Sequence, residues 1–269
     1  MNQKNNNSRS SVTPTQSTIL EQGDIFFFYR PKVRSETVES IEDVRRFFMI
    51  LAPESNGKKS LYRLLVIGKK SLPEIRKTEA RSSERYWTRV GGIFDDPTQL
   101  TRELFSKEFR DGDVARPVGE GKYAIVSHYS HTELAFVLEL PKELGEAQKE
   151  LGIEKEASYI ITVINPKIPK REEYLPTTEE DPKYPESVLN DFNDKENFVP
   201  LSRNLKFIDY QNAQIILIGA REGKDTLRQE LGITVENESE NDHSADIFTT
   251  LKIHKDQVPI KPLIQGKLE

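Results

Sequence analysis

The chain has 269 residues, a formal net charge of −5 and no cysteine. This length suits one large domain or two small ones, and the missing cysteines exclude a disulfide framework, thiol catalysis and a thiolate metal site. The N-terminal residues lack the apolar segment of a secretory signal, and no apolar stretch is long enough to span a bilayer. The sequence therefore predicts a soluble, cytoplasmic protein without a membrane partner.

Charge is distributed unevenly along the chain. Residues 23–90 contain 15 Lys/Arg against 9 Asp/Glu, a net of +6, whereas residues 91–269 contain 22 against 34, a net of −12. Two parts that face each other, or that each carry a solvated face, would explain this difference. The alternative is an anion-binding surface on the first part.

The first third of the chain has the pattern of short strands behind a polar tail. Residues 1–20 are rich in Asn, Ser, Gln and Thr and predict a disordered tail. Aromatic and β-branched residues bounded by Pro or Gly predict strands over residues 25–30, 46–52, 61–67 and 85–90. The first two are apolar on both alternating faces, so we expect them in a sheet that is covered on both sides.

The clearest predicted helix begins at Pro97. Asp96 is a good N-cap, proline suits the first helical position, and Gln99 completes a spacing similar to a capping box. Four apolar residues recur at helical spacing and predict packing against a core: Leu100, Leu104, Phe105 and Phe109. We expect this helix to end before Asp111.

The second half of the chain alternates strands with short helices. Residues 122–127 and 133–140 predict a hairpin whose turn carries His128 and His131. Further strands are predicted over residues 158–165, 213–218 and 247–253, and short helical segments over residues 143–151, 185–192 and 224–231. Residues 167–205 are rich in proline and charge, which is typical of a long insertion.

Two stretches follow the same order of features, which indicates an internal duplication. Residues 26–68 and 136–219 each begin with phenylalanine, pass two strand-ending prolines and finish in an apolar strand closed by glycine. We therefore expect an α+β, β-rich fold with mixed or mainly antiparallel sheets and a few short helices. Its predicted modules are residues 21–132 and 133–255, separate or joined in one compact domain, followed by an extended tail over residues 256–269.

Four segments carry a resemblance to a known family: residues 23–31 (GDIFFFYRP), 62–73 (YRLLVIGKKSLP), 133–141 (ELAFVLELP) and 216–220 (ILIGA). They resemble a family of conserved prokaryotic hypothetical proteins, over roughly residues 20–235. The resemblance implies a full-length intracellular protein. It carries over no activity, ligand or catalytic residue.

The nearest approach to a cofactor motif is a glycine-containing segment at residues 219–226, after a predicted strand and before a predicted helix. Three residues separate its two glycines, whereas a P-loop has four between them, and Asp225 stands where the magnesium-binding hydroxyl belongs. An ordinary strand-to-helix turn is favoured. No catalytic residue is assigned, and no cofactor is expected.

His128 and His131 have a spacing that would let two imidazoles approach one metal ion, provided that Glu133 or His243 supplies a third ligand. No recognised metal motif surrounds them. A solvated turn is therefore favoured, and no metal is expected.

The basic segment, residues 58–89, holds 10 Lys/Arg against 3 Glu, interleaved with aromatic residues. Basic and aromatic side chains together hold phosphates and stack bases. The net negative charge of the whole chain argues against a dedicated nucleic-acid binder. The sequence does not identify a partner; an acidic protein or another anionic ligand stays open as an alternative, and nucleic acid is disfavoured.

Three functions remain open from the residues alone. The first is a non-catalytic binding or scaffold module, the second an enzyme of unrecognised type with a site between the two halves, and the third anion or nucleic-acid binding through the basic segment. The candidate ligand-binding residues are Arg30, Lys32, Arg46, Trp87, His128 and His131. The enzyme hypothesis requires Arg30 and Arg46 to lie together rather than on separate convex faces.

Overall fold

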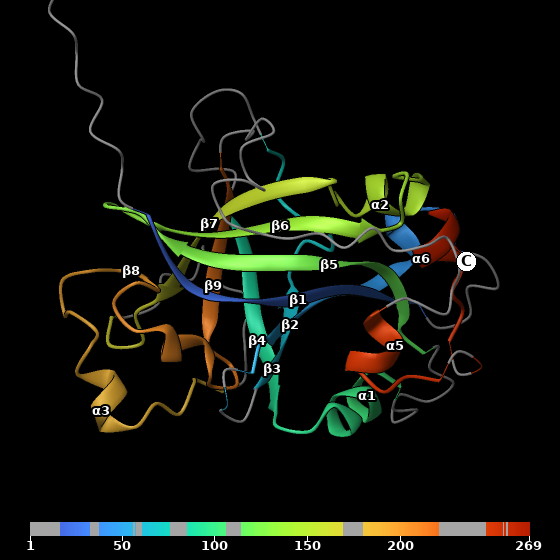
Figure 1. Ribbon diagram of the computed structural model, residues 1–269. Coiled ribbons are helices and arrows are strands. Elements are labelled where there is room, and N and C mark those ends of the chain that lie inside the picture. Colours follow the sequence, from blue (N-terminus) through green and yellow to red (C-terminus); the bar gives the residue numbers. More distant parts are fainter. Residues whose placement is uncertain are drawn as a thin grey trace, which may run out of the picture.

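The centre of the computed structural model is a closed barrel of eight antiparallel strands (Figure 1). The structure describes residues 17–32, 38–55, 57, 61–75, 85–105, 114–168, 180–220, 246–254, 256 and 258–269. Within these residues, no helix is long and apolar enough to cross a membrane. The barrel bears out the prediction of a β-rich chain with a few short helices.

Half of the barrel is a four-stranded antiparallel meander from the first part of the chain. Its strands are β1 (Thr18–Pro31), β2 (Val44–Pro53), β3 (Tyr62–Ile67) and β4 (Tyr86–Phe94). The four predicted strands are confirmed, and proline ends both β1 and β2 because it lacks the N–H that would continue the ladder. β1 starts earlier than the predicted tail allows, at Thr18, while residues 1–16 lie outside the described residues.

The other half of the barrel is a second meander from later in the chain. Its strands are β5 (Arg116–Ser127), β6 (Thr132–Leu140), β7 (Glu156–Ile164) and β9 (Gln214–Gly219). β5 pairs with β1 and β9 pairs with β4, which closes the barrel, and the short β8 (Phe198–Pro200) adds to the end of β7. Each pairing among the described strands is antiparallel, so the mixed sheet that the sequence left open is not confirmed.

Apolar side chains fill the barrel and also cover part of its outer wall. Phe27, Phe47, Phe136 and Tyr159 belong to the inner cluster, in which the rings of Phe27 and Phe136 lie 5.2 Å apart. An eight-stranded barrel is just wide enough for side chains to fill, and these rings occupy that space. A second cluster lies on the outer faces of β1, β2 and β3, so β1 and β2 are buried on both sides, as predicted.

Short helices surround this outer cluster and the barrel ends. α1 (Pro97–Phe105) begins where predicted, and Asp96 Oδ1 accepts a hydrogen bond from the Thr98 amide at 2.9 Å. Figure 1 shows α1 and α5 (Asp246–Thr250) on one side of the barrel, with α3 (Glu186–Leu189) and β8 on the other. The remaining helical elements are η1 (Ile41–Asp43), α2 (Glu146–Glu150), η4 (Leu205–Ile208) and α6 (Lys261–Gln265).

Two predictions near the C-terminus are wrong. Residues 247–253 were expected to form a strand, but α5 begins at Asp246, where the buried Glu120 carboxylate accepts the amides of Asp246 and Ile247 at 3.1 and 2.9 Å. This carboxylate satisfies the first free N–H groups of a helix, a contact that local sequence does not reveal. The predicted extended tail contains α6, whose Leu263 is fully buried in the outer cluster. The predicted helix at residues 224–231 lies outside the described residues.

The internal duplication is not confirmed. In the predicted alignment Phe26 corresponds to Phe136, yet Phe26 lies in the outer cluster and Phe136 in the inner one. Likewise, Leu64 packs outside the barrel and its predicted counterpart Ile215 packs inside. Residues that the alignment equates therefore lie on opposite sides of the barrel wall. In addition, strands of both predicted modules build the same barrel.

Candidate functional site

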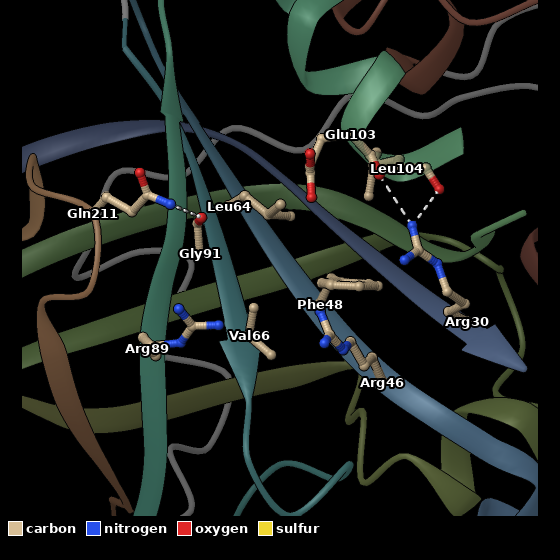
Figure 2. Close-up of a pocket in the computed structure, with 10 residues that line it drawn as sticks. All are labelled: Arg30, Arg46, Phe48, Leu64, Val66, Arg89, Gly91, Glu103, Leu104 and Gln211. Carbon is tan, nitrogen blue, oxygen red and sulfur yellow. Dashed lines mark hydrogen bonds between the residues drawn. The ribbon is translucent and has the colours of Figure 1, made fainter. Parts of the chain in front are cut away.

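A pocket of about 180 Å³ lies on the outer wall of the barrel, where β1 to β4 approach the last turn of α1 (Figure 2). Three arginines line it: Arg30 from β1, Arg46 from β2 and Arg89 from β4. Glu103 of α1 is the one carboxylate among the described lining residues. The lining therefore carries more positive than negative charge. We call this the arginine pocket.

The register of the barrel explains why these arginines converge. Arg30 and Arg46 are directly opposite each other in the β1–β2 pairing, and such partners project side by side from one face of a sheet. Arg89 reaches the same face from β4, where it is opposite Val66 of β3. Figure 2 shows Arg46 and Arg89 on either side of Val66, with Arg30 directed toward α1.

Gly91 forms part of one wall of the pocket, where a larger residue would not fit. A Cβ added to Gly91 would lie 2.8 Å from Val66 Cγ2, which is closer than real Cβ contacts allow. Gln211 Nε2 donates a hydrogen bond to the Gly91 carbonyl at 3.2 Å and lines the pocket from the loop before β9. The pocket thus combines a small apolar floor with hydrogen-bond donors at its edge.

Arg30 also has a structural contact with α1. Its Nη2 donates to the carbonyls of Glu103 and Leu104 at 3.0 and 2.8 Å, and its guanidinium lies 5.6 Å from the centre of the Phe48 ring. A cation suits the end of a helix, where free carbonyls concentrate negative potential. The Nε of Arg30 is buried and has no hydrogen-bond partner among the described residues.

Burial and mutual repulsion perturb two of the three arginines. Burial lowers the pKa of Arg30, and the positive charge of Arg46 lowers it further. Burial also lowers the pKa of Arg89, again with Arg46 as the second cause. Arg89 Nη1 donates to Asn212 Oδ1 at 2.7 Å, which fixes the direction of its side chain. An anion between these groups would relieve the repulsion.

The structure brings some of the predicted ligand-binding residues together and separates others. Arg30 and Arg46 share the arginine pocket, as the enzyme hypothesis requires. Lys32 lies beyond the end of β1, exposed, and its backbone N–H donates to the Asp43 carbonyl at 2.7 Å. Trp87 is half-buried on β4 and does not line the pocket. His128 and His131 lie in the turn between β5 and β6.

Arg89 and Glu103 were not among the predicted site residues. Arg89 belongs to the basic segment, but its role depends on strand order, because β3 separates β4 from β2. Glu103 comes from the helix that packs over the strands. Residues 58–60 and 76–84 of the basic segment, and residues 221–226 of the glycine-containing segment, lie outside the described residues.

The scan against protein-family models, the search of curated proteins and the search of solved structures each return no match for this chain. The resemblance to conserved prokaryotic hypothetical proteins therefore stays a prediction.

Proposed function

We propose that this protein is a binding module that holds the anionic group of a ligand, a phosphate or a carboxylate, in the arginine pocket. The observation that carries this proposal is the convergence of Arg30, Arg46 and Arg89 on one small, partly buried space. A guanidinium stays charged at neutral pH and offers several N–H donors in a fork that matches phosphate and carboxylate oxygens.

The size of the pocket supports a small group rather than a whole drug-sized ligand. Its volume is about 180 Å³, whereas pockets that enclose such ligands span about 300–1,000 Å³. The rest of a larger ligand would extend over the outer wall of the barrel. Binding is favoured over catalysis because guanidinium groups, which hold their protons, dominate the polar lining.

A thermal-shift titration of the full chain with inorganic phosphate tests the proposal. A ligand that binds only the folded state stabilises it by about 2.7 kcal/mol at 100 times its Kd, which raises Tm by several degrees in a chain of this size. Sodium chloride at matched ionic strength separates site binding from screening. Citrate in a parallel titration distinguishes a carboxylate preference from a phosphate preference.

The diagnostic variant is Arg89→Gln, and the matched control is Arg102→Gln. Arg102 lies on α1, is exposed and does not line the pocket, so its loss removes the same charge from the same region. Arg89→Gln should lose most of the ligand-induced shift, whereas Arg102→Gln should keep it. Equal responses to phosphate, citrate and chloride in the wild-type protein would refute the proposal, as would an unchanged response in Arg89→Gln.

Nucleic acid is a separate arm of the same test, because Arg89 belongs to the basic segment. A short single-stranded oligonucleotide is titrated at low and high salt. We expect inorganic phosphate to raise Tm while the oligonucleotide produces no comparable shift, since a small concave pocket cannot contact successive phosphates along a nucleic-acid strand. A salt-dependent oligonucleotide shift without any response to phosphate or citrate would favour the nucleic-acid hypothesis instead.

A further inference from the structure

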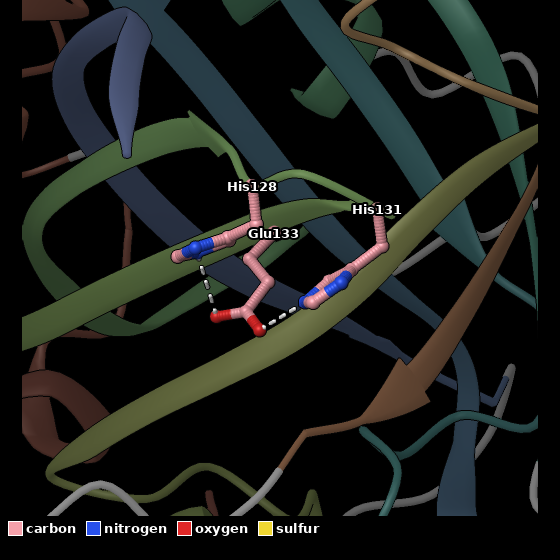
Figure 3. Close-up of side chains that lie close together, drawn as sticks. All are labelled: His128, His131 and Glu133. Atoms are coloured by element: carbon pink, nitrogen blue, oxygen red, sulfur yellow. Dashed lines mark hydrogen bonds and ion pairs between the residues drawn. The ribbon is translucent and has the colours of Figure 1, made fainter. Parts of the chain in front are cut away.

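The turn between β5 and β6 gathers two imidazoles and a carboxylate (Figure 3). The His128 amide donates to the His131 carbonyl at 2.9 Å and closes the turn, which places the two rings in a stack with centres 5.0 Å apart. Glu133, on the outer face of β6, points back toward both rings. Its Oε1 lies 2.7 Å from His131 Nε2 and its Oε2 lies 3.7 Å from His128 Nε2.

The spacing of these donor atoms suits one small cation. One ligand atom from each residue lies within 4.8 Å of the other two. A tetrahedral zinc ion about 2.0–2.1 Å from each ligand holds its donor atoms about 3.3 Å apart, between the two measured Nε2–carboxylate distances. Side-chain adjustments of less than about 1 Å would therefore bring the three groups into coordination distance.

Two serine hydroxyls form hydrogen bonds with these side chains and orient them. Ser130 Oγ lies 3.1 Å from His131 Nδ1, so it can accept the Nδ1–H and leave the Nε2 lone pair directed at the ion. The Ser158 hydroxyl, from the adjacent strand β7, donates to Glu133 Oε2 at 2.6 Å. Supporting contacts of this kind hold metal-ligating histidines and carboxylates in place in known metal sites.

We propose that His128, His131 and Glu133 bind a divalent transition-metal ion, zinc in the first instance, through both Nε2 atoms and the carboxylate. Two imidazoles favour zinc and its transition-metal neighbours over magnesium and calcium, which prefer oxygen ligands. The three side chains are 21–32% exposed, so water or a ligand can occupy a fourth position.

This site is independent of the arginine pocket. His128 follows the last residue of β5, whereas the arginine pocket lies near the opposite end of that strand, where Arg116 pairs with Tyr29 beside Arg30. Failure of anion binding would therefore leave the metal proposal intact, and the reverse also holds.

Isothermal titration of the chelator-treated full chain with zinc chloride tests the proposal. We expect saturation at one equivalent, together with a rise in Tm. Cobalt(II) in place of zinc gives a second readout, because a low-coordinate Co²⁺ ion with imidazole ligands absorbs visible light more strongly than hexaaqua Co²⁺. Magnesium chloride at the same concentration should produce neither signal.

Substitutions identify the ligands. His131→Gln and Glu133→Gln should abolish stoichiometric binding, and Ser158→Ala should weaken it by about 10–100-fold through the loss of support to the carboxylate. His254→Gln and His243→Gln are the matched controls, since they remove the chain's other two histidines. Circular dichroism of each variant without metal confirms that it folds.

The absence of saturable zinc binding by the wild-type chain would overturn the proposal and leave an ordinary hydrogen-bonded turn. Zinc binding that survives in Glu133→Gln, or that disappears in His254→Gln or His243→Gln, would equally overturn it. Weaker binding in Ser158→Ala with its cobalt spectrum retained supports the proposed geometry, because a surface histidine pair would not depend on that hydroxyl.

Discussion

Replacing Arg63 with methionine should destabilise the barrel by about 3 kcal/mol, because the change removes the cation from a buried charge cluster. Arg63 lies at the start of β3 and is 4% exposed. Its Nη1 donates to Glu21 Oε1 at 2.6 Å, and its Nε donates to Asp209 Oδ1 at 2.7 Å. The Tyr123 hydroxyl donates to the same Glu21 oxygen at 2.7 Å.

The magnitude follows from the charges that the substitution leaves behind. Methionine is unbranched and flexible, so it fills much of the space of arginine and the main loss is electrostatic. Removal of one partner from a buried ion pair costs about 3–5 kcal/mol, since the other charge remains buried without compensation. The lower end applies here because Glu21 is 12% and Asp209 20% exposed, so water partly solvates both carboxylates.

Urea denaturation at neutral pH measures this loss, with fluorescence of the single tryptophan, Trp87, and far-UV circular dichroism as two probes of one transition. The matched control is the double variant Arg63→Met/Glu21→Gln, which removes an orphaned charge and should recover a large part of the lost stability. The reasoning is refuted if Arg63→Met costs less than about 1 kcal/mol, the level of an exposed ion pair, or if the double variant recovers nothing.

Two further predictions concern buried polar groups. Tyr159→Phe should stabilise the protein by about 1 kcal/mol, because the buried Tyr159 hydroxyl has no hydrogen-bond partner among the described residues. Burial raises the pKa of Tyr159, so above about pH 10 the unfolded chain loses the phenol proton while the folded protein keeps it. The stability of the wild-type protein should therefore fall above about pH 10 more steeply than the stability of Tyr159→Phe. Equal shifts of the urea midpoint in the two proteins between about pH 8 and pH 11 would contradict this. Glu120→Ala should free the N-terminus of α5 and cost about 1.5–3 kcal/mol of local stability, visible as faster hydrogen exchange in Asp246–Thr250 with α1 unchanged. Unaltered exchange in α5 would show that Glu120 does not hold this helix.

The sequence by itself determined the features that depend on short-range preferences. β1 and β2 carry apolar residues on both alternating faces, and the structure buries both faces. The start of α1 follows from Asp96 and Pro97, because a side-chain acceptor and a fixed φ act within one helical turn. The turn that carries His128 and His131 also follows from short-range preferences, because it connects two consecutive strands of one hairpin.

Only the tertiary structure decided which of these local features meet. The arginine pocket depends on the pairing that sets Arg30 opposite Arg46 and on the strand order that brings Arg89 to the same face. Residues 247–253 have a strand-like composition, yet α5 forms there because the carboxylate of Glu120, distant in sequence, accepts its first amides.

The metal proposal depends on tertiary structure for a supporting contact rather than for its ligands. The histidine spacing is visible in the sequence, but Ser158 reaches Glu133 only because β7 pairs with β6. Strand register and order are set by the packing of the whole barrel. Contacts between residues far apart in the chain therefore cannot be derived from local preference; the arginine pocket consists largely of such contacts, whereas the metal site depends on one of them, from Ser158 to Glu133.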